Sequence, residues 1–363
     1  MNKEVISEYQ GISLLTMFII GSSLVLPTAT EAGSDSWLAI ILALFFSLPI
    51  ACIYVRVFLL SSGNDLFDAF IYVFGKIFGK IICLLYIWFS FHLGSLVIRD
   101  FGEFPITVSM PETPLIVFMG MITFLSIWAV KEGIEALGRW GSFFFIISIV
   151  FFFMAVFMLI PEMDLDNIQP VLYKGIKPVL RGSFSTFSFP FAETIVFLLS
   201  IFSLKSKKNY CKAYIKGLLI GGIVLVIAQF TQISVLGEHI YGATYFPGRD
   251  SVSKIDIGNF IQRVEIIAFV ALFIPSFVKL CICLLAASNG IIKLFNLKDY
   301  RFIVVPISLC MLNLSYLIND NLMSFAKWTG EIWPYYAFLF QVIIPVITWI
   351  AIEIKTIRKN RFI

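Results

Sequence analysis

Charged side chains are scarce in this sequence of 363 residues, because Asp, Glu, Lys and Arg together make up only 14% of it. A soluble domain carries roughly a quarter. The chain is also 59% hydrophobic and contains 39 Phe residues. This composition excludes an ordinary soluble domain and predicts an integral membrane protein. With a net charge of only +4, we expect membrane lipid to surround the chain and no nucleic acid to bind it.

The residues of metal and nucleophile chemistry are also few. The chain has two His and six Cys, and it contains no C-x-x-C pair, no H-E-x-x-H and no G-x-S-x-G. These absences exclude a Cys-based zinc site, a zinc protease of that type and an esterase elbow. The cysteines lie in or beside apolar runs, where they act as small buried side chains. We therefore expect no enzymatic activity, no metal and no cofactor.

Long apolar runs dominate what is present. Runs near 20 residues are typical of membrane-spanning helices. They predict ten spans, at 9–32, 37–60, 80–102, 113–130, 140–160, 178–203, 212–236, 259–289, 302–318 and 332–355. The segment 61–79 has apolar residues at helical spacing, which indicates an amphipathic helix on the membrane surface. The other long connections are 161–177 and 237–258, and the latter is a candidate outer lid or partner-docking loop.

The distribution of Lys and Arg predicts the orientation. Eighteen of the 27 basic residues fall on the side that carries both termini, eight fall on the other side, and Lys279 lies within a span. Cytoplasmic segments are enriched in Lys and Arg. Both termini are therefore expected in the cytoplasm, which agrees with an even number of spans.

Two of the ten predicted helices are interrupted. Gly21, Ser22, Ser23 and Pro27 interrupt the first, in GSSLVLP, and Pro190 interrupts the sixth, in FSFPFAET. Interrupted helices at matching positions of two halves are typical of inverted-repeat transporters. We expect one polytopic domain, 1–363, with five-helix repeats at 9–160 and 178–355. The alternative is that both interruptions are ordinary proline kinks.

An unwound membrane helix leaves backbone groups without intrahelical partners. Such groups are tolerated only where they line a cavity or bind something. Free N–H groups at a half-helix N-terminus suit a carboxylate, and free carbonyls suit an ammonium. The two breaks together therefore predict a site for an α-amino acid.

Three segments carry a resemblance to a known family. ISEYQGISLLTMFIIGSSLVLP, FSFPFAETIVFLLSIF and IGNFIQRVEIIAFVALFIPSFVKLCICLLAASNG resemble the spore germination B-subunit family, within the amino acid–polyamine–organocation transporter superfamily. The resemblance covers the whole chain and implies an all-α integral membrane fold of the LeuT/APC type, with ten helices in a 5+5 inverted repeat and discontinuous helices 1 and 6.

The resemblance also implies a function. Members are permease-like subunits of germinant receptors in the inner membrane of bacterial endospores, and they assemble with an A subunit and a C-type lipoprotein subunit. The implied function is sensing of a small-molecule germinant, most simply an amino acid, with both termini on the spore-core side. The alternative is a proton-coupled amino acid permease that transports its ligand, because the same pocket serves both functions.

Ionisable residues within spans are candidate functional groups. Glu193 follows the helix 6 break and Lys279 lies deep in helix 8. Glu193 either contacts the ligand, carries a proton, or pairs with Lys279. Lys279 either takes the place of the cation that sodium-coupled relatives of this fold hold, or lines a water-filled cavity. Arg263 and Glu265 open helix 8 and are expected to be structural charges.

The remaining candidates surround the two breaks. The expected ligand-binding residues are Gly21, Ser22, Ser23, His92, Phe187, Ser188, Phe189 and Glu193. Phe187 is either a gate over the ligand or ordinary packing. His92, near the centre of helix 3, is either a titrating group or a hydrogen-bonded structural one.

Overall fold

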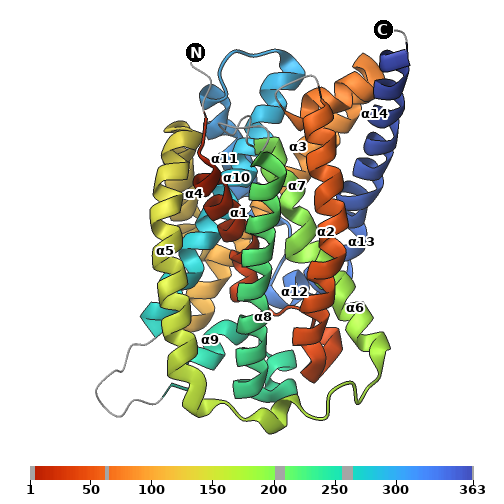
Figure 1. Ribbon diagram of the computed structural model, residues 1–363. Coiled ribbons are helices and arrows are strands. Elements are labelled where there is room, and N and C mark those ends of the chain that lie inside the picture. Colours follow the sequence, from red (N-terminus) through yellow and green to blue (C-terminus); the bar gives the residue numbers. More distant parts are fainter. Residues whose placement is uncertain (1–4, 62–64, 201–208, 256–264, 362–363) are drawn as a thin grey trace.

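The structure is a computed structural model that describes residues 5–61, 65–200, 209–255 and 265–361, and the regular elements of this part of the chain are helices (Figure 1). The α-helices are α1 (Glu8–Ile20), α2 (Ser36–Leu60), α3 (Leu66–Val108), α4 (Leu115–Lys131), α5 (Ile134–Leu159), α6 (Ile176–Thr186), α7 (Ile195–Ser200), α8 (Tyr210–Ala243), α9 (Pro247–Val252), α10 (Glu265–Phe295), α11 (Arg301–Leu317), α12 (Leu322–Glu331), α13 (Trp333–Phe338) and α14 (Ile344–Arg361).

Seven helices of the described residues are long and apolar enough to span a membrane, and eight if α11 and α12 count as one bent span. α1 and α4 are apolar but shorter. The predicted all-helical, multi-span fold class is therefore confirmed. The start predicted for the eighth span, 259–264, lies outside the described residues.

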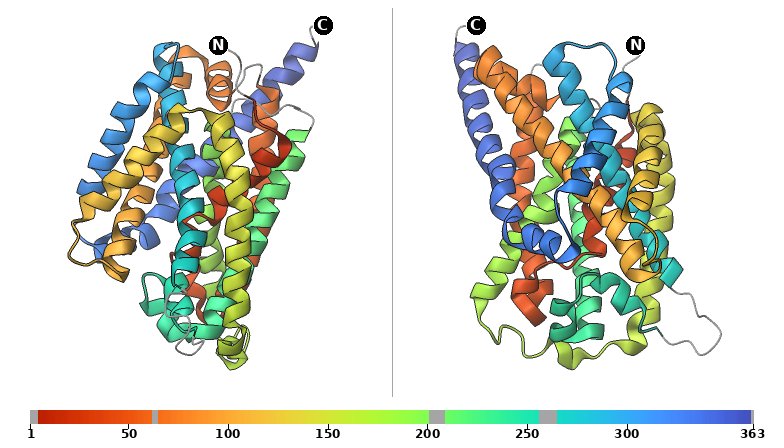
Figure 2. Two further views of the ribbon diagram at one scale, coloured as in Figure 1. Left: turned by 90° about the vertical axis from the view of Figure 1, so that its left-hand side faces the viewer. Right: turned by 180° about the vertical axis from the view of Figure 1, so that it is seen from behind.

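The helices form one elongated bundle, and both chain ends lie at the same end of it (Figure 1). α10 packs against α1, α3, α5 and α7 and so occupies the centre. Seen from behind, α12 lies across the bundle on the half away from the termini (Figure 2). α12 follows α11 after a bend of 102°. It lies in the stretch 319–331, between two predicted spans, where no helix was predicted.

Helix 1 stops halfway. A capping box of Ser7 and Gln10 begins α1, and α1 ends at Gly21, where φ is −30° and ψ is −114°. Thirteen residues span about 20 Å, against the roughly 30 Å of a bilayer core. The predicted interruption of helix 1 is present: a short 3₁₀ turn, Ser22–Leu24, leads into a non-helical stretch, and a second 3₁₀ turn, Thr30–Asp35, follows it.

Side chains of α8 satisfy that non-helical stretch. The Gln232 amide donates to the Leu24 carbonyl at 3.3 Å, and the Tyr241 hydroxyl accepts the Thr28 N–H at 2.8 Å. Unpaired backbone groups are costly away from water. The polar residues of α8 therefore stabilise the interruption as a permanent feature of the fold, which an ordinary proline kink would not require.

Helix 6 is interrupted in a different way. α6 continues into a π-helical turn, Phe187–Phe191, and a 3₁₀ turn, Ala192–Thr194, before α7 begins. Phe189 has non-helical dihedrals, with φ at −135° and ψ at 111°. Pro190 lacks an N–H and cannot continue the hydrogen-bond ladder of α6. The predicted interruption of helix 6 is present.

The predicted surface helix at 61–79 is continuous with helix 3. Both belong to α3, but Gly75 has φ +80° and ψ −178° and turns the chain between them. The Lys355 ammonium donates to the carbonyls of Tyr72 and Val73 at 2.8 Å, just before the turn. Lys293 binds Asp68 at 2.7 Å and thereby ties this segment to α10.

Gly75→Ala is expected to lower the free energy of unfolding by about 1–3 kcal/mol, because only glycine adopts this backbone region without strain. No atom lies within 4 Å of the added Cβ, so the loss would come from the backbone alone. Gly120→Ala in α4 is the control, since its Cβ also meets open space and its φ is not positive; it should be neutral or stabilise by up to about 1 kcal/mol. Denaturant unfolding in mixed micelles measures both, and equal effects would contradict the role of the turn.

Candidate functional site

An ion pair buried at the centre of the bundle joins α10 to the interrupted helix 6. The Lys279 ammonium of α10 lies 2.6 Å from Oε2 of Glu193, and both side chains are 0% exposed. Glu193 stands in the 3₁₀ turn after the helix 6 break. A charged pair without water is stable only when both charges are present together. The structure thus shows the pairing of Glu193 with Lys279 that the sequence analysis gave as one of its alternatives.

The break in helix 1 makes room for the lysine. A Cβ on Gly21 would lie 3.3 Å from Cδ of Lys279, so the lysine stem packs directly against the end of α1. The ammonium lies 4.6 Å from the ring centre of Phe189 and 5.4 Å from that of Phe18. Aromatic faces stabilise a cation electrostatically. Lys279 therefore contacts both interrupted helices and Glu193 at once.

The backbone of the helix 6 break is satisfied by the protein itself. The Gln341 amide donates to the Ser188 carbonyl at 2.8 Å, and the Ser188 hydroxyl donates to Gln341 Oε1 at 3.0 Å. The Tyr54 hydroxyl lies within hydrogen-bonding distance of the Ala192 carbonyl. Ser188 was predicted to contact a ligand, whereas here both of its polar groups bind Gln341, which the sequence analysis did not single out.

Gln341→Leu is expected to lower the free energy of unfolding by about 1–3 kcal/mol, because it leaves the buried Ser188 carbonyl without a donor. Thr348→Val is the matched control on α14, since the buried Thr348 hydroxyl bonds only to Ile344 of its own helix. The control should cost much less. Unfolding titrations of the two variants decide the matter, and equal losses would mean that Gln341 does not hold the break together.

Buried side-chain polar atoms without partners lie at both breaks, Thr186 Oγ1 and Glu193 Oε1 at helix 6 and Ser22 Oγ at helix 1. Ser22 Oγ and Asp100 Oδ1 are buried and make no hydrogen bond of ordinary geometry. Both residues line one small cavity, together with Ser276 and a group of apolar residues: Val25, Leu26, Phe101, Phe104, Phe246 and Phe273. Buried polar groups without partners are rare in native proteins and need an explanation. Asp100 lies on α3 and was not among the predicted site residues.

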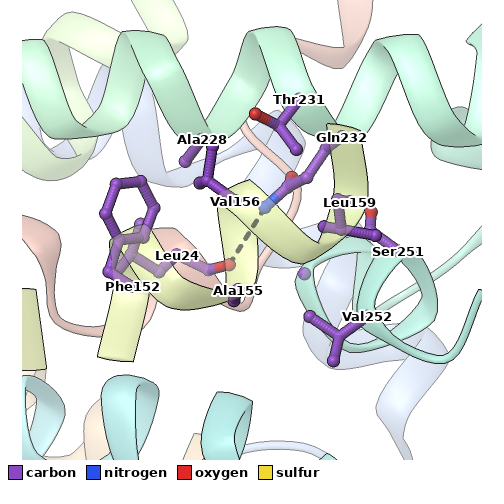
Figure 3. Close-up of a pocket in the computed structure, with 11 residues that line it drawn as sticks. Leu24, Phe152, Ala155, Val156, Leu159, Ala228, Thr231, Gln232, Ser251 and Val252 are labelled. Carbon is purple, nitrogen blue, oxygen red and sulfur yellow. Dashed lines mark hydrogen bonds between the residues drawn. The ribbon is translucent and has the colours of Figure 1, made fainter. Parts of the chain in front are cut away.

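A second cavity lies behind the same stretch of chain. α5, α8 and α9 line it, and the Gln232 side chain crosses it to reach the Leu24 carbonyl (Figure 3). Its walls are otherwise largely apolar, with Phe152, Val156 and Leu159 contributed by α5. α9 therefore packs over the helix 1 break.

His92 lies in an aromatic cluster. Its ring packs against Trp88, Trp328, Trp333 and Tyr336 with centroids 5.1–6.0 Å apart. Nδ1 lies 3.4 Å from the Tyr336 hydroxyl. These contacts dock α12 and α13 onto α3.

The other predicted residues take simpler positions. The Ser23 hydroxyl donates to Ile19 at 3.0 Å and so points back into its own helix. Phe187 is buried, but it is Phe189 whose ring faces the Lys279 ammonium. Arg263 lies outside the described residues, and Glu265 is the first residue of α10.

Two polar groups near the site escaped the sequence analysis although a signal was present. Asp100 is an ionisable residue within a predicted span, and Gln341 is a polar one. Intramembrane ionisable and polar residues are functional candidates by default. The residue before Asp100, Arg99, does not pair with it. Arg99 forms a separate buried pair with Glu103 at 2.6 Å and also donates to the Ser315 carbonyl in the last turn of α11.

Comparison with known proteins identifies the family to which the sequence is similar. Residues 5–323 match the profile of the family described as "Spore germination protein". The chain is 28% identical to "Spore germination protein KB" of Bacillus subtilis, over 99% of this chain and 98% of that protein. It is 24% identical to "Spore germination protein A2" of the same organism, over 96% of each.

Two solved transporter structures share the fold. MhsT, in complex with L-phenylalanine, superposes with a TM-score of 0.68 at 12% identity and covers 98% of this chain and 99% of its own. MHP1, a nucleobase-cation-symport-1 family transporter in a closed conformation with bromovinylhydantoin bound, gives 0.64 at 12% identity over 93% and 79%. Both have the LeuT fold.

Proposed function

Because the chain belongs to the spore germination protein family, we propose that it is the small-molecule-sensing membrane subunit of a germinant receptor. The observation that supports this proposal best is the interrupted α1, with the unsatisfied Ser22 hydroxyl in a cavity beside the buried Glu193–Lys279 pair. In this proposal the ligand, most simply an amino acid, binds at the breaks of helices 1 and 6. Binding favours one of two packings of the same helices.

The proposal includes the finer points that the family suggests. The protein lies in the inner membrane of the spore with both termini on the core side, and it assembles with A-type and C-type subunits. The two five-helix repeats, 9–160 and 178–355, move relative to each other when the ligand binds. Glu193 and Lys279 form a charged pair within the second repeat, and the Lys279 stem contacts the first repeat at Gly21.

Saturable binding of a labelled amino acid to the purified protein in nanodiscs tests the proposal. Ser22→Trp should abolish binding, because an indole would fill the cavity. Gly120→Trp is the control, since this residue of α4 faces open space. Spores that carry Ser22→Trp in place of the natural chain should fail to respond to the same amino acid. Binding that survives Ser22→Trp would refute the helix-break site.

The second candidate is a proton-coupled amino acid permease. The buried carboxylates Glu193 and Asp100 favour it, because ionisable chains in membrane proteins serve as proton relays. Uptake of the labelled amino acid into proteoliposomes separates the two functions. A sensing subunit binds without sustained uptake, whereas a permease accumulates the amino acid when the lumen is made alkaline.

A further inference from the structure

Asp100 is a buried carboxylate for which the structure supplies no cation. Its Oδ1 has no hydrogen-bond partner, and the salt bridges of the described residues do not include it. The neighbouring Arg99 turns to Glu103 and to carbonyls of α11 instead. Asp100 is close enough to interact electrostatically with Lys279 and Glu193. With all three ionised, this cluster carries one negative charge in excess, which a buried site tolerates poorly.

The cavity at Asp100 has the chemistry of an ammonium site. Ser22 is only 2% exposed, and its hydroxyl lines the cavity together with the Asp100 carboxylate, with which it interacts. Four aromatic rings also line the cavity; the Phe101 and Phe273 centroids lie 4.8 Å apart and those of Phe104 and Phe246 lie 5.1 Å apart. A carboxylate, a hydroxyl oxygen and ring faces all attract a cation that donates hydrogen bonds.

The size of the cavity matches the end of a ligand. Its volume is about 20 Å³, which is room for one water-sized group. A neighbouring cavity of about 30 Å³ shares Leu26, Asp100 and Phe246 with it. An ammonium group fits the first cavity, and the remainder of an amine needs the second cavity and some movement of its walls.

Phe246 separates these cavities from a depression on the surface of the protein. It lines both of them and also an open depression of about 490 Å³, which Thr107, His239 and Arg249 line as well. Phe246 itself is 4% exposed and precedes α9. A ligand that arrives from the depression therefore meets the Phe246 ring before it meets Asp100.

We propose that Asp100 and Ser22 bind the ammonium group of an amine ligand that enters past Phe246. This inference rests on the proposed function and makes it more specific, because it places recognition of the amine on α3 and not on Glu193, whose charge Lys279 already balances. The ligand class is a primary amine, of which an amino acid is one case. A neutral analogue with a hydroxyl in place of the amine lacks the charge that Asp100 requires.

The first experiment uses the twenty L-amino acids as probes of thermal unfolding of the full chain in nanodiscs. The best stabiliser is then compared with its 2-hydroxy acid analogue. We expect the analogue, and the Asp100→Asn variant with the amino acid, to bind about 10- to 100-fold more weakly, as the loss of a charge-assisted hydrogen bond implies. Equal binding of the amine and the analogue, or wild-type affinity in Asp100→Asn, would overturn the inference.

Matched variants control for folding. Ser22→Ala should weaken binding, whereas Ser23→Ala should not, because the Ser23 hydroxyl is bonded to its own helix. Glu112→Gln, an exposed carboxylate beyond α3, should leave binding unchanged. Should Asp100→Asn not fold, the contrast between Ser22→Ala and Ser23→Ala decides the question alone.

The second experiment separates this inference from the proposed function. Methylammonium chloride is compared with sodium and potassium chloride at equal concentration. Stabilisation by methylammonium that disappears in Asp100→Asn supports the ammonium site even if no amino acid binds, in which case the amino acid proposal alone fails. Stabilisation by sodium or potassium that depends on Asp100, without any by methylammonium, identifies a metal-cation site and overturns the inference, as does the absence of any effect that depends on Asp100.

Discussion

Glu193→Gln should lower the free energy of unfolding by about 3–5 kcal/mol, because it leaves the buried Lys279 ammonium without its salt-bridge partner. Lys279→Met should cost a similar amount, because it leaves the carboxylate alone. Neither residue is exposed, so water cannot replace the lost partner. Reversible unfolding in mixed detergent micelles measures both variants.

The double variant Glu193→Gln, Lys279→Met should recover most of the lost stability, since an uncharged pair avoids the cost of burying two ions. Glu353→Gln is the control, because the Arg56–Glu353 pair also joins two helices but has an Arg56 side chain that is 54% exposed. That control should change stability by at most about 1 kcal/mol. A double variant no more stable than either single variant would show that the pair is not coupled in this way.

Gly248→Ala should lower the free energy of unfolding by about 1–3 kcal/mol, the usual cost of overpacking. The added Cβ would lie 2.2 Å from the Leu24 carbonyl oxygen, so either α9 or the helix 1 break must move. The same carbonyl accepts a hydrogen bond from Gln232, which the movement would weaken. Hydrogen exchange should therefore rise at Leu24 and its neighbours as well as in α9.

Gly242→Ala, near the end of α8 and shortly before α9, is the matched control, because no atom lies within 4 Å of its Cβ and its φ is not positive. It should leave both stability and hydrogen exchange near the wild-type values. If Gly248→Ala altered hydrogen exchange in α9 but not near Leu24, α9 would pack against the helix 1 break without being coupled to it.

The sequence predicted the class of the fold well because membrane spans are set by apolar length alone. It also located both interruptions, since Gly21 and Pro190 break helices by local chemistry. The form of the chain after the first break could not be predicted, because the non-helical residues 25–29 are held by hydrogen bonds that Gln229, Gln232 and Tyr241 of α8 make with Leu24 and Thr28. Such distant hydrogen bonds leave no periodic signal.

The site was predicted in part for the same reason. Glu193 and Lys279 were conspicuous as charges within spans, so their pairing could be given as an alternative, but the sequence could not choose it over contact with a ligand. Ser188 was expected to face a ligand because its break lies in the membrane, whereas Gln341, far away in the chain, satisfies it. Asp100 could have been found by treating every ionisable residue within a span as a candidate.

α3 is long enough that a small tilt at one end produces a large displacement at the other. Arg99 ties one point of α3 to the end of α11 through the Ser315 and Tyr316 carbonyls, and Asp100 lies beside that point. From Asp100 to the turn at Gly75 the helix runs about 38 Å, so a tilt of about 5° around Arg99 would shift the Gly75 end by about 3 Å. The Lys355 contacts with Tyr72 and Val73 lie at that far end. A tilt of this size changes the distances around Asp100 very little, but it is large enough to break the Lys355 hydrogen bonds at the far end of α3.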